Sequence, residues 1–326
     1  MELTTTGTPA ALSSVLRERL DAVSNLAKRT NKATVLVVQQ FPVAEDAGIF
    51  FPPVRESIAN ILAFVELGTA PDLAWALDAA RAHPFNWIAV DCDQKLAESA
   101  AIVELARTRI EHERLLFYSD NQVWFDSGLD IVSRLEGGLT GKRVLLAGSG
   151  PLADCFRDAL PRIGAAIVTP PEIAGSAAAP AVVLGVAQKR ESIDVPIVDA
   201  LPAAAAIYDV GLGNLSPAAA DHARAKGLRL YRLDNRAGIS SAIVRLLETD
   251  FMVGRLMGHL RVKGVDIVAG GLLAPPGAVI VDDIRNPAVI FGVADGSGRF
   301  REPLEPADEQ RVAFVRSLLR SGVAAP

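Results

Sequence analysis

The sequence predicts an α/β protein made of two wound αβ domains, the second a Rossmann domain, with a small β-rich addition at the C-terminus. Apolar runs typical of buried strands alternate with segments of helical spacing between residues 33 and 255, which favours parallel sheets covered by helices. Two glycines near residue 138 separate the two halves, and a Gly- and Pro-rich segment follows residue 255. We therefore predict domains at 1–138, 139–255 and 256–326.

The chain is 326 residues long, which is enough for two domains that each bury a core. No run approaches the roughly 20 apolar residues of a membrane helix, and the N-terminus lacks the basic start and apolar block of an export signal. The two cysteines, Cys92 and Cys155, have no CxxC partner, which suits a reducing compartment. We expect a cytoplasmic protein without a membrane partner.

Charge and histidine content exclude two further classes of partner. The net charge is −5 and no Lys/Arg stripe is visible, so a nucleic-acid surface is not expected. The four histidines are scattered without metal-ligand spacing, so no metal site is expected. A small-molecule substrate is the expected partner, and a homodimer is compatible with these observations.

The first domain is predicted to begin with an amphipathic helix of about 20 residues within 1–32. Residues 33–41 form a continuous apolar run between Lys32 and Pro42, which predicts a strand buried on both faces. Residues 54–68 have helical apolar spacing and end in glycine, so a helix is predicted there. The remaining elements alternate: helix 71–83, strand 86–93, helix 95–110, strand 114–121 and helix 125–138.

The second domain continues the alternation. After a strand and helix around residues 142–160, further strands are predicted at 164–169, 180–187, 205–211 and 227–234. A long helix is predicted from Ser240 or Ser241, as the N-cap, to Gly264 just past its end. The tail is predicted to be a β addition with a hairpin turn at 295–298, followed by a last helix at 305–322.

The most specific motif is GSGPLA, which matches the pattern G-x-G-x-x-G/A directly after a predicted strand and before a predicted helix. In a Rossmann domain the first Gly permits the tight turn, the second lets a pyrophosphate approach the backbone, and a small sixth residue lets helix and strand pack closely. The helix N-terminus then offers amides and partial positive charge to phosphate. The predicted cofactor-binding residues of this turn are Gly148, Ser149, Gly150, Pro151, Leu152 and Ala153.

The cofactor is predicted to be NAD or NADP, and the choice between them stays open. The second strand ends in Thr169, Pro170 and Pro171, and Glu172 arrives a little later than the acidic residue that binds a ribose in NAD-preferring domains. Four more residues are predicted near the nicotinamide or in the loop opposite it, although turn chemistry alone also explains these residue types. They are Asp209, Gly211, Asn235 and Gly238.

The order of parts resembles the amino-acid-dehydrogenase-like superfamily, which includes shikimate dehydrogenase and methylene-tetrahydropterin dehydrogenases. The resemblance lies in the αβ first half, the helix ending in G-G-x-x-G-K, the GxGxxA turn and the return helix after N-R-x-G-I. The first half looks most like the dehydrogenase of pyrrolysine biosynthesis, which oxidises a primary amine so that the product cyclises to an imine. This likeness lies in VLVVQQF, FPPVRESIANILAF and WIAVDCD.

The candidate catalytic residues come partly from this resemblance, which implies that Ser57 and Asp93 contact the substrate. Asp93 ends a predicted parallel strand, at the edge where wound sheets bind ligands, and Asp91 is a nearby alternative. Both acids could instead cap the following helix. Glu56 and Ser57 are predicted to open a helix, where an exposed first turn is the alternative.

Asp126 is the fourth catalytic candidate. It lies with Asp130 on the predicted helix between the domains, where a cleft would lie, although a solvated helix face explains both acids equally well. Asp126 is displaced from the position just before glycine that the catalytic Asp of shikimate dehydrogenases occupies.

The resulting functional expectation is a nicotinamide-dependent oxidoreductase. The resemblance implies action on a C–N bond of an amine, amino-acid or imine substrate in small-molecule biosynthesis, as part of amino-acid metabolism. Two alternatives stay open: a methylene-tetrahydropterin dehydrogenase, and a nucleotide-free Rossmann scaffold that binds a metabolite or a partner.

Overall fold

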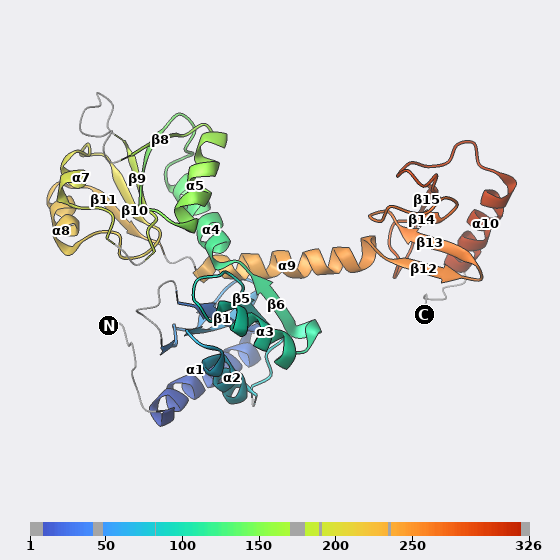
Figure 1. Ribbon diagram of the computed structural model, residues 1–326, viewed down its shortest axis with the longest axis horizontal. Coiled ribbons are helices and arrows are strands. Elements are labelled where there is room, and N and C mark those ends of the chain that lie inside the picture. Colours follow the sequence, from blue (N-terminus) through green and yellow to red (C-terminus); the bar gives the residue numbers. More distant parts are fainter. Residues whose placement is uncertain are drawn as a thin grey trace. The chain divides into compact units, whose positions relative to one another are not determined.

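The computed structural model describes residues 9–41, 48–81, 83–169, 180–188, 191–233 and 236–320 (Figure 1). The chain divides into two compact units, Met1–Ile243 and Val244–Pro326. Two wound αβ halves make up the first unit, and a small sheet with one covering helix makes up most of the second. This is the predicted α/β fold class.

The N-terminal half is built on a largely parallel sheet in the order β2-β4-β1-β5-β6, with β3 paired to β4. Strands β4, β1, β5 and β6 are parallel, and β2 and β3 run antiparallel to β4. Its strands are β1 (Ala33–Gln40), β2 (Ile49–Phe50), β3 (Arg55–Glu56), β4 (Asn60–Leu67), β5 (Trp87–Asp91) and β6 (Leu115–Tyr118). Its helices are α1 (Pro9–Thr30), α2 (Ala70–Ala80), α3 (Ser99–Arg109) and α4 (Asp120–Leu135), with a 3-10 turn η2 (His112–Arg114).

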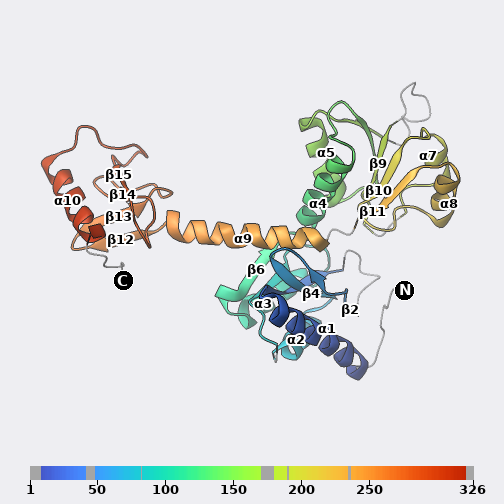
Figure 2. The ribbon, with the colours of Figure 1, turned by 180° about the vertical axis from the view of Figure 1, so that it is seen from behind.

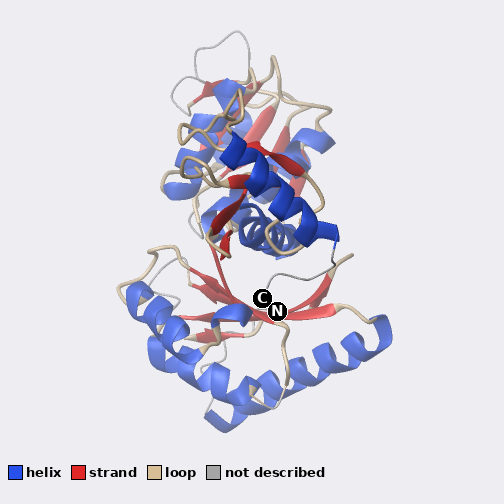
Figure 3. Ribbon diagram, turned by 90° about the vertical axis from the view of Figure 1, so that its right-hand side faces the viewer, coloured by secondary structure: helices blue, strands red, loops and turns tan. Residues whose placement is uncertain are grey.

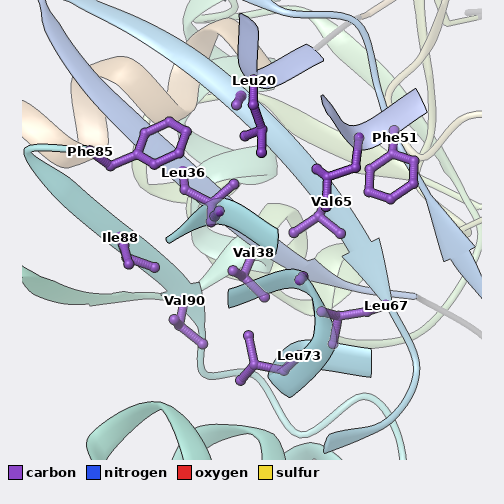
Figure 4. Close-up of a cluster of buried hydrophobic side chains, with 14 of the residues drawn as sticks. Leu20, Leu36, Val38, Phe51, Val65, Leu67, Leu73, Phe85, Ile88 and Val90 are labelled. Atoms are coloured by element: carbon purple, nitrogen blue, oxygen red, sulfur yellow. The ribbon is translucent and has the colours of Figure 1, made fainter. Parts of the chain in front are cut away.

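Helices α1, α2 and α3 cover one face of this sheet (Figure 3). Alternate residues of the central strands, such as Leu36 and Val38 of β1, point into this core, where they meet Leu20 of α1 and Leu73 of α2 (Figure 4). This packing, together with the pairing of the strands, determines where the end of each strand lies. Since β1, β5 and β6 are parallel, their carboxyl ends lie along one edge of the sheet.

One predicted element of this half is wrong. Residues 54–68, predicted to form a helix, form β3, a turn and β4, and β4 pairs with β1 from Ala33↔Asn60 to Gln40↔Leu67. A short apolar run has the same appearance in a buried strand and in a buried helix, and here pairing with the central strand decides the outcome. Ser57 closes the turn, because its backbone N–H and its hydroxyl both donate to the carbonyl of Asn60.

The second half has a five-stranded parallel sheet in the order β11-β10-β9-β7-β8 (Figure 2). Helices α4 and α5 pack on one face of this sheet, and α7 and α8 pack on the other. The strand order reverses between β7 and β9, and such a switch point is where wound sheets bind ligands. The strands are β7 (Arg143–Ala147), β8 (Ala166–Val168), β9 (Val182–Gly185), β10 (Ala206–Asp209) and β11 (Arg229–Arg232). The helices are α5 (Pro151–Arg162), α7 (Val195–Asp199), α8 (Pro217–Ala225) and α9 (Arg236–Leu256).

The second unit contains the predicted β addition and the predicted last helix, α10 (Pro306–Arg320). Its sheet has the order β12-β13-β14-β15, formed by His259–Val262, Val265–Ala269, Val279–Val281 and Ile290–Val293. The predicted extension of the preceding helix to Gly264 is wrong, because α9 ends at Leu256 and β12 follows. Lys263 and Gly264, both at positive φ, form a two-residue turn between β12 and β13.

The predicted boundary at 138/139 lies in the connection between α4 and β7, and the one at 255/256 lies in the last turn of α9. The division into two compact units falls between Ile243 and Val244 in the sequence. The division into three domains stays a prediction. Among the described residues, none of the helices has the length and apolar character needed to span a bilayer.

Candidate active site

A series of hydrogen bonds joins the carboxyl edge of the first sheet to the loop that follows β9. Asp93 follows β5, and its Oδ2 accepts the backbone N–H of Asn121 in the first turn of α4 at 2.7 Å. The Oδ1 of Asn121 then accepts from Nε2 of Gln188 at 2.9 Å. Gln188 lies three residues beyond Gly185, the last residue of β9. The carboxyl ends of both sheets therefore meet at one place, with Asp93 in it.

The second carboxylate oxygen of Asp93, Oδ1, has a different environment. Among the described residues, no hydrogen bond engages it, whereas Oδ2 is held by Asn121. One oxygen of Asp93 is therefore available to a ligand while the other fixes the side chain.

The two glycines of the GSGPLA turn have different surroundings. A side chain at Gly148 (φ 124°) would overlap the backbone nitrogen of Ala187, so only glycine fits there. Gly150 also has a positive φ, of 106°, but apart from Gly150 itself and its two chain neighbours no described residue has an atom within 4 Å of the place where its Cβ would be. The two glycines therefore have different tasks, because one permits close packing and the other leaves open space.

The start of α5 faces this open space without a side-chain cap. Pro151 occupies the first helical turn, and Gly150 provides no side-chain hydrogen bond at the N-cap. Leu152 and Ala153 are buried, whereas Ser149 is exposed. The acidic residue of the first turn, Asp154, is ion-paired with Arg157. The amides and the positive end of the helix dipole can therefore receive an anion such as a phosphate.

A buried charged cluster lies directly behind Asp93. Lys95 Nζ is 2.8 Å from Asp91 Oδ2 and 2.6 Å from Asp120 Oδ2, and all three side chains are at most 6% exposed. Burial raises the pKa of Asp91 from its ordinary value of 3.8 to about 7, although Lys95 opposes this shift. Burial lowers the pKa of Lys95, but the two carboxylates outweigh burial and raise it above its ordinary value. We call Asp91, Lys95 and Asp120 the buried cluster.

Two glutamines at the end of β1 complete this edge. Gln40 Nε2 donates to the carbonyl oxygens of Asp91 and Asp93, at 2.8 and 3.1 Å, and its Oε1 accepts from the hydroxyl of Ser99. Gln39 Nε2 donates to Asp120 Oδ1 at 3.1 Å. The turn that carries Asp93 is therefore held through both its backbone and its neighbours.

The structure does not bring Glu56 and Ser57 to Asp93. They lie at the amino end of β4, whereas Asp93 follows the carboxyl end of the parallel strand β5, and strands of this length separate the two edges by roughly 20 Å. Glu56 is paired with Lys32 at 2.7 Å, and Ser57 exchanges a hydrogen bond of 2.7 Å with Ser240 of α9. Neither residue begins a helix, contrary to the prediction.

Asp126 lies on a helix, as predicted, whereas Gly238, predicted to lie in a loop, lies in the first turn of α9. Asp126 is on α4 itself, where it accepts from Gln122 Nε2 at 2.7 Å. A Cβ on Gly238 would come within 2.6 Å of Cβ of Ser127, so Gly238 permits the close approach of α9 to α4. The predicted cofactor residues Glu172 and Asn235 lie outside the described residues.

Asp209 organises a loop. Its Oδ2 accepts the backbone N–H of Gly213 at 2.7 Å, and its Oδ1 accepts from Nδ2 of Asn214 at 2.7 Å. Gly211 packs against the backbone of Ala187, where a Cβ would overlap the carbonyl oxygen. These contacts agree with the alternative of turn chemistry, and they place the loop after β10 beside the loop after β9. Within the described ranges, no three His, Cys, Asp or Glu side chains are grouped to hold a metal ion.

Sequence reasoning missed several polar residues of this edge. These residues share a position in the sequence. All but one lie at the end of an apolar strand or within three residues after it, and the remaining one, Lys95, lies four residues after Asp91, the last residue of such a strand. A search for polar residues at strand ends would have found them. They are Gln39, Gln40, Lys95, Asp120, Asn121 and Gln188.

The chain resembles some solved structures but no known family. No protein-family model matches the sequence, and no curated protein matches it. The chain is similar to the crystal structure of a dipicolinate synthase subunit from Bacillus halodurans, at 10% identity and a TM-score of 0.32, over 65% of this chain and 78% of that one. It is also similar to the crystal structure of dipicolinate synthase from Bacillus subtilis, at 8% identity and a TM-score of 0.28, over 67% of this chain and 97% of that one.

Proposed function

We propose that this chain is a nicotinamide-dependent oxidoreductase that acts on a C–N bond of an amine, amino-acid or imine substrate. The observation that carries the proposal is the open space at Gly150, at the uncapped start of α5. Exposed turn glycines such as Gly227 and Gly264 have the same open space, and Gly150 differs from them because it begins α5 directly after β7, at the switch point of the sheet. The hydrogen-bonded series Asp93–Asn121–Gln188 supplies polar groups next to the switch point of the second sheet.

The residues of the turn fit the diphosphate of a nicotinamide dinucleotide. Gly148 brings the loops after β7 and β9 together, Gly150 leaves room for the phosphates, and the first-turn amides of α5 would donate to them. When bound, the nicotinamide ring accepts or gives up a hydride. We expect only a mild preference between NADH and NADPH, with dissociation constants within about 100-fold of each other.

Asp93 is the residue that we assign to the substrate. Its Oδ2 is held by the N–H of Asn121, and its Oδ1 would accept a hydrogen bond from a substrate ammonium. A carboxylate in this position can also take the proton that an ammonium must lose before the carbon atom gives up its hydride. The amide of Asn121, fixed by Gln188, would orient the substrate beside it.

The test is Gly150→Val, with binding of NADH and NADPH measured by calorimetry. The added side chain would fill the space at the turn, so we expect binding to be lost while the circular dichroism spectrum is kept. Gly227→Val is the matched control, because Gly227 also has a positive φ and open space around its Cβ position but lies after α8. A parent protein that binds neither nucleotide would leave a nucleotide-free scaffold as the correct description. A Gly150→Val variant that binds as the parent does would show that the nucleotide does not bind at the glycine turn.

A further inference from the structure

The buried cluster is connected to the candidate site through backbone groups. Asp91 Oδ1 accepts the N–H of Asp93 at 3.0 Å and the N–H of Asp120 at 3.4 Å. Its Oδ2 accepts from Lys95 at 2.8 Å and from the N–H of Gln40 at 3.4 Å. One fully buried carboxylate therefore ties together the turn after β5, the start of α4 and the end of β1.

We propose that Asp91 is a positioning residue of this site: through the buried cluster it holds Asp93 and Asn121 in the arrangement that receives a ligand. Among the described residues, no hydrogen bond joins Asp91 to the glycine turn. Asp91 would therefore act on a ligand only indirectly, through Asp93 and Asn121. The role in ligand binding rests on the function proposed above. The hold on Asp93 and Asn121 does not, and it can be measured without any ligand.

The charge state of Asp91 affects this hold. An ionised carboxylate accepts on both oxygens, whereas a protonated one donates from one of them and cannot keep all four hydrogen bonds. The charged and titratable groups around Asp91 are Lys95, Asp93 and Cys92 from its own segment, Tyr118 from β6 and Asp120 from α4. Gln40 of β1 and Ser99 of α3, which also pack here, are neutral. Since burial raises the pKa of Asp91 to about 7, its proton is exchanged in an accessible pH range.

The experiment is a pH titration of the full chain labelled with ¹⁵N, from about pH 5.5 to about pH 8.5, following the amide resonances of Asp93, Asp120 and Asn121. We expect the three resonances to move with one shared midpoint within about one unit of pH 7. In Asp91→Asn this titration should disappear, and in Asp130→Asn, which changes an exposed acid of α4, it should stay. Flat resonances in the parent, or an unchanged titration in Asp91→Asn, would overturn the proposal.

Hydrogen exchange supplies a second measurement. Asp91→Asn keeps an oxygen that can accept the N–H of Asp93, so the exchange rate of this amide should stay within about threefold of the parent. Asp91→Ala removes the acceptor, and the rate should rise at least about tenfold. Equal exchange rates in Asp91→Ala and the parent would contradict the proposal that Asp91 positions Asp93. If Asp91→Ala does not fold, the pH titration of Asp91→Asn is the test. NADH binding by the parent protein, measured separately, tests the proposed function and not this inference.

Discussion

At the scale of single residues, Asp93 combines a structural and a chemical task. Its Oδ2 accepts the N–H of Asn121 in the first turn of α4, whereas the alternative considered from the sequence is a cap of the following helix, which is α3. Its Oδ1 is not engaged by the described residues. The roles of the two oxygens can be tested separately with asparagine at this position, because asparagine retains one acceptor oxygen and loses the negative charge.

Asp93→Asn should therefore keep the fold and the affinity for NADH, since the remaining oxygen can still accept the N–H of Asn121. Turnover of an amine substrate should fall by about 100-fold or more, because a charge-assisted bond and a proton acceptor are lost together. Steady-state kinetics and calorimetry on the same preparation check both statements. Equal kcat/KM in variant and parent would remove Asp93 from the site.

Asp209 is expected to affect stability. Asp209→Ala leaves the N–H of Gly213 and the side chain of Asn214 without their acceptor, which should cost about 1–3 kcal/mol of unfolding free energy. Urea unfolding followed by circular dichroism measures the loss. Asp221→Ala is the control, because Asp221 is an exposed acid paired with Arg224 on α8, and its removal should change stability by less than about 0.5 kcal/mol.

At the scale of secondary-structure elements, the αβ alternation of the second half could be predicted because each strand is short, apolar and bounded by turn residues. The strand β4 could not, because its apolar pattern is also compatible with a buried helix and only pairing with β1 selects the strand. The same limit affected the site. Asp93 and the glycine turn follow from local patterns, whereas the buried cluster depends on segments that come together only in the folded sheet.

The hairpin β12–β13 gives a prediction at this scale. Lys263 has a φ of 49° in its two-residue turn, a conformation that asparagine adopts readily and a β-branched residue does not. Lys263→Val should destabilise the hairpin by about 1–2 kcal/mol, while Lys263→Asn should leave it nearly unchanged. Hydrogen exchange of the amides in 259–269 reports the difference. Similar protection in both variants would show that the positive φ at position 263 does not limit the stability of the hairpin.

At the scale of the whole molecule, the buried cluster links stability to pH. The pKa of Asp91 is raised in the folded protein, so the folded state binds more protons than the unfolded state between pH 3.8 and about 7. The unfolding free energy should therefore fall as the pH rises through this window, by on the order of 1.4 kcal/mol per pH unit from this group, and level off above it.

Asp91→Asn should lack this contribution. All three tryptophans, Trp75, Trp87 and Trp124, lie in the first 138 residues, so their fluorescence reports the part of the molecule that contains the cluster. Urea unfolding at about pH 5 and about pH 8 should show a larger loss of stability with pH in the parent than in the variant. Parallel pH profiles would mean that Asp91 does not carry the titration.

The distribution of the two cores within the first unit has a consequence for synthesis on the ribosome. The first core draws its residues from 15–117, whereas α4 contributes Trp124, Phe125, Leu129 and Val132 to the second core, where Phe125 meets Phe156 edge-on at 5.0 Å between ring centroids. The nascent chain can thus form its first core before α5 and the strands of the second sheet, against which α4 packs, have been synthesised. Ribosome-bound chains of increasing length should become resistant to protease in two steps, the first requiring the chain through β6 and the second requiring β11.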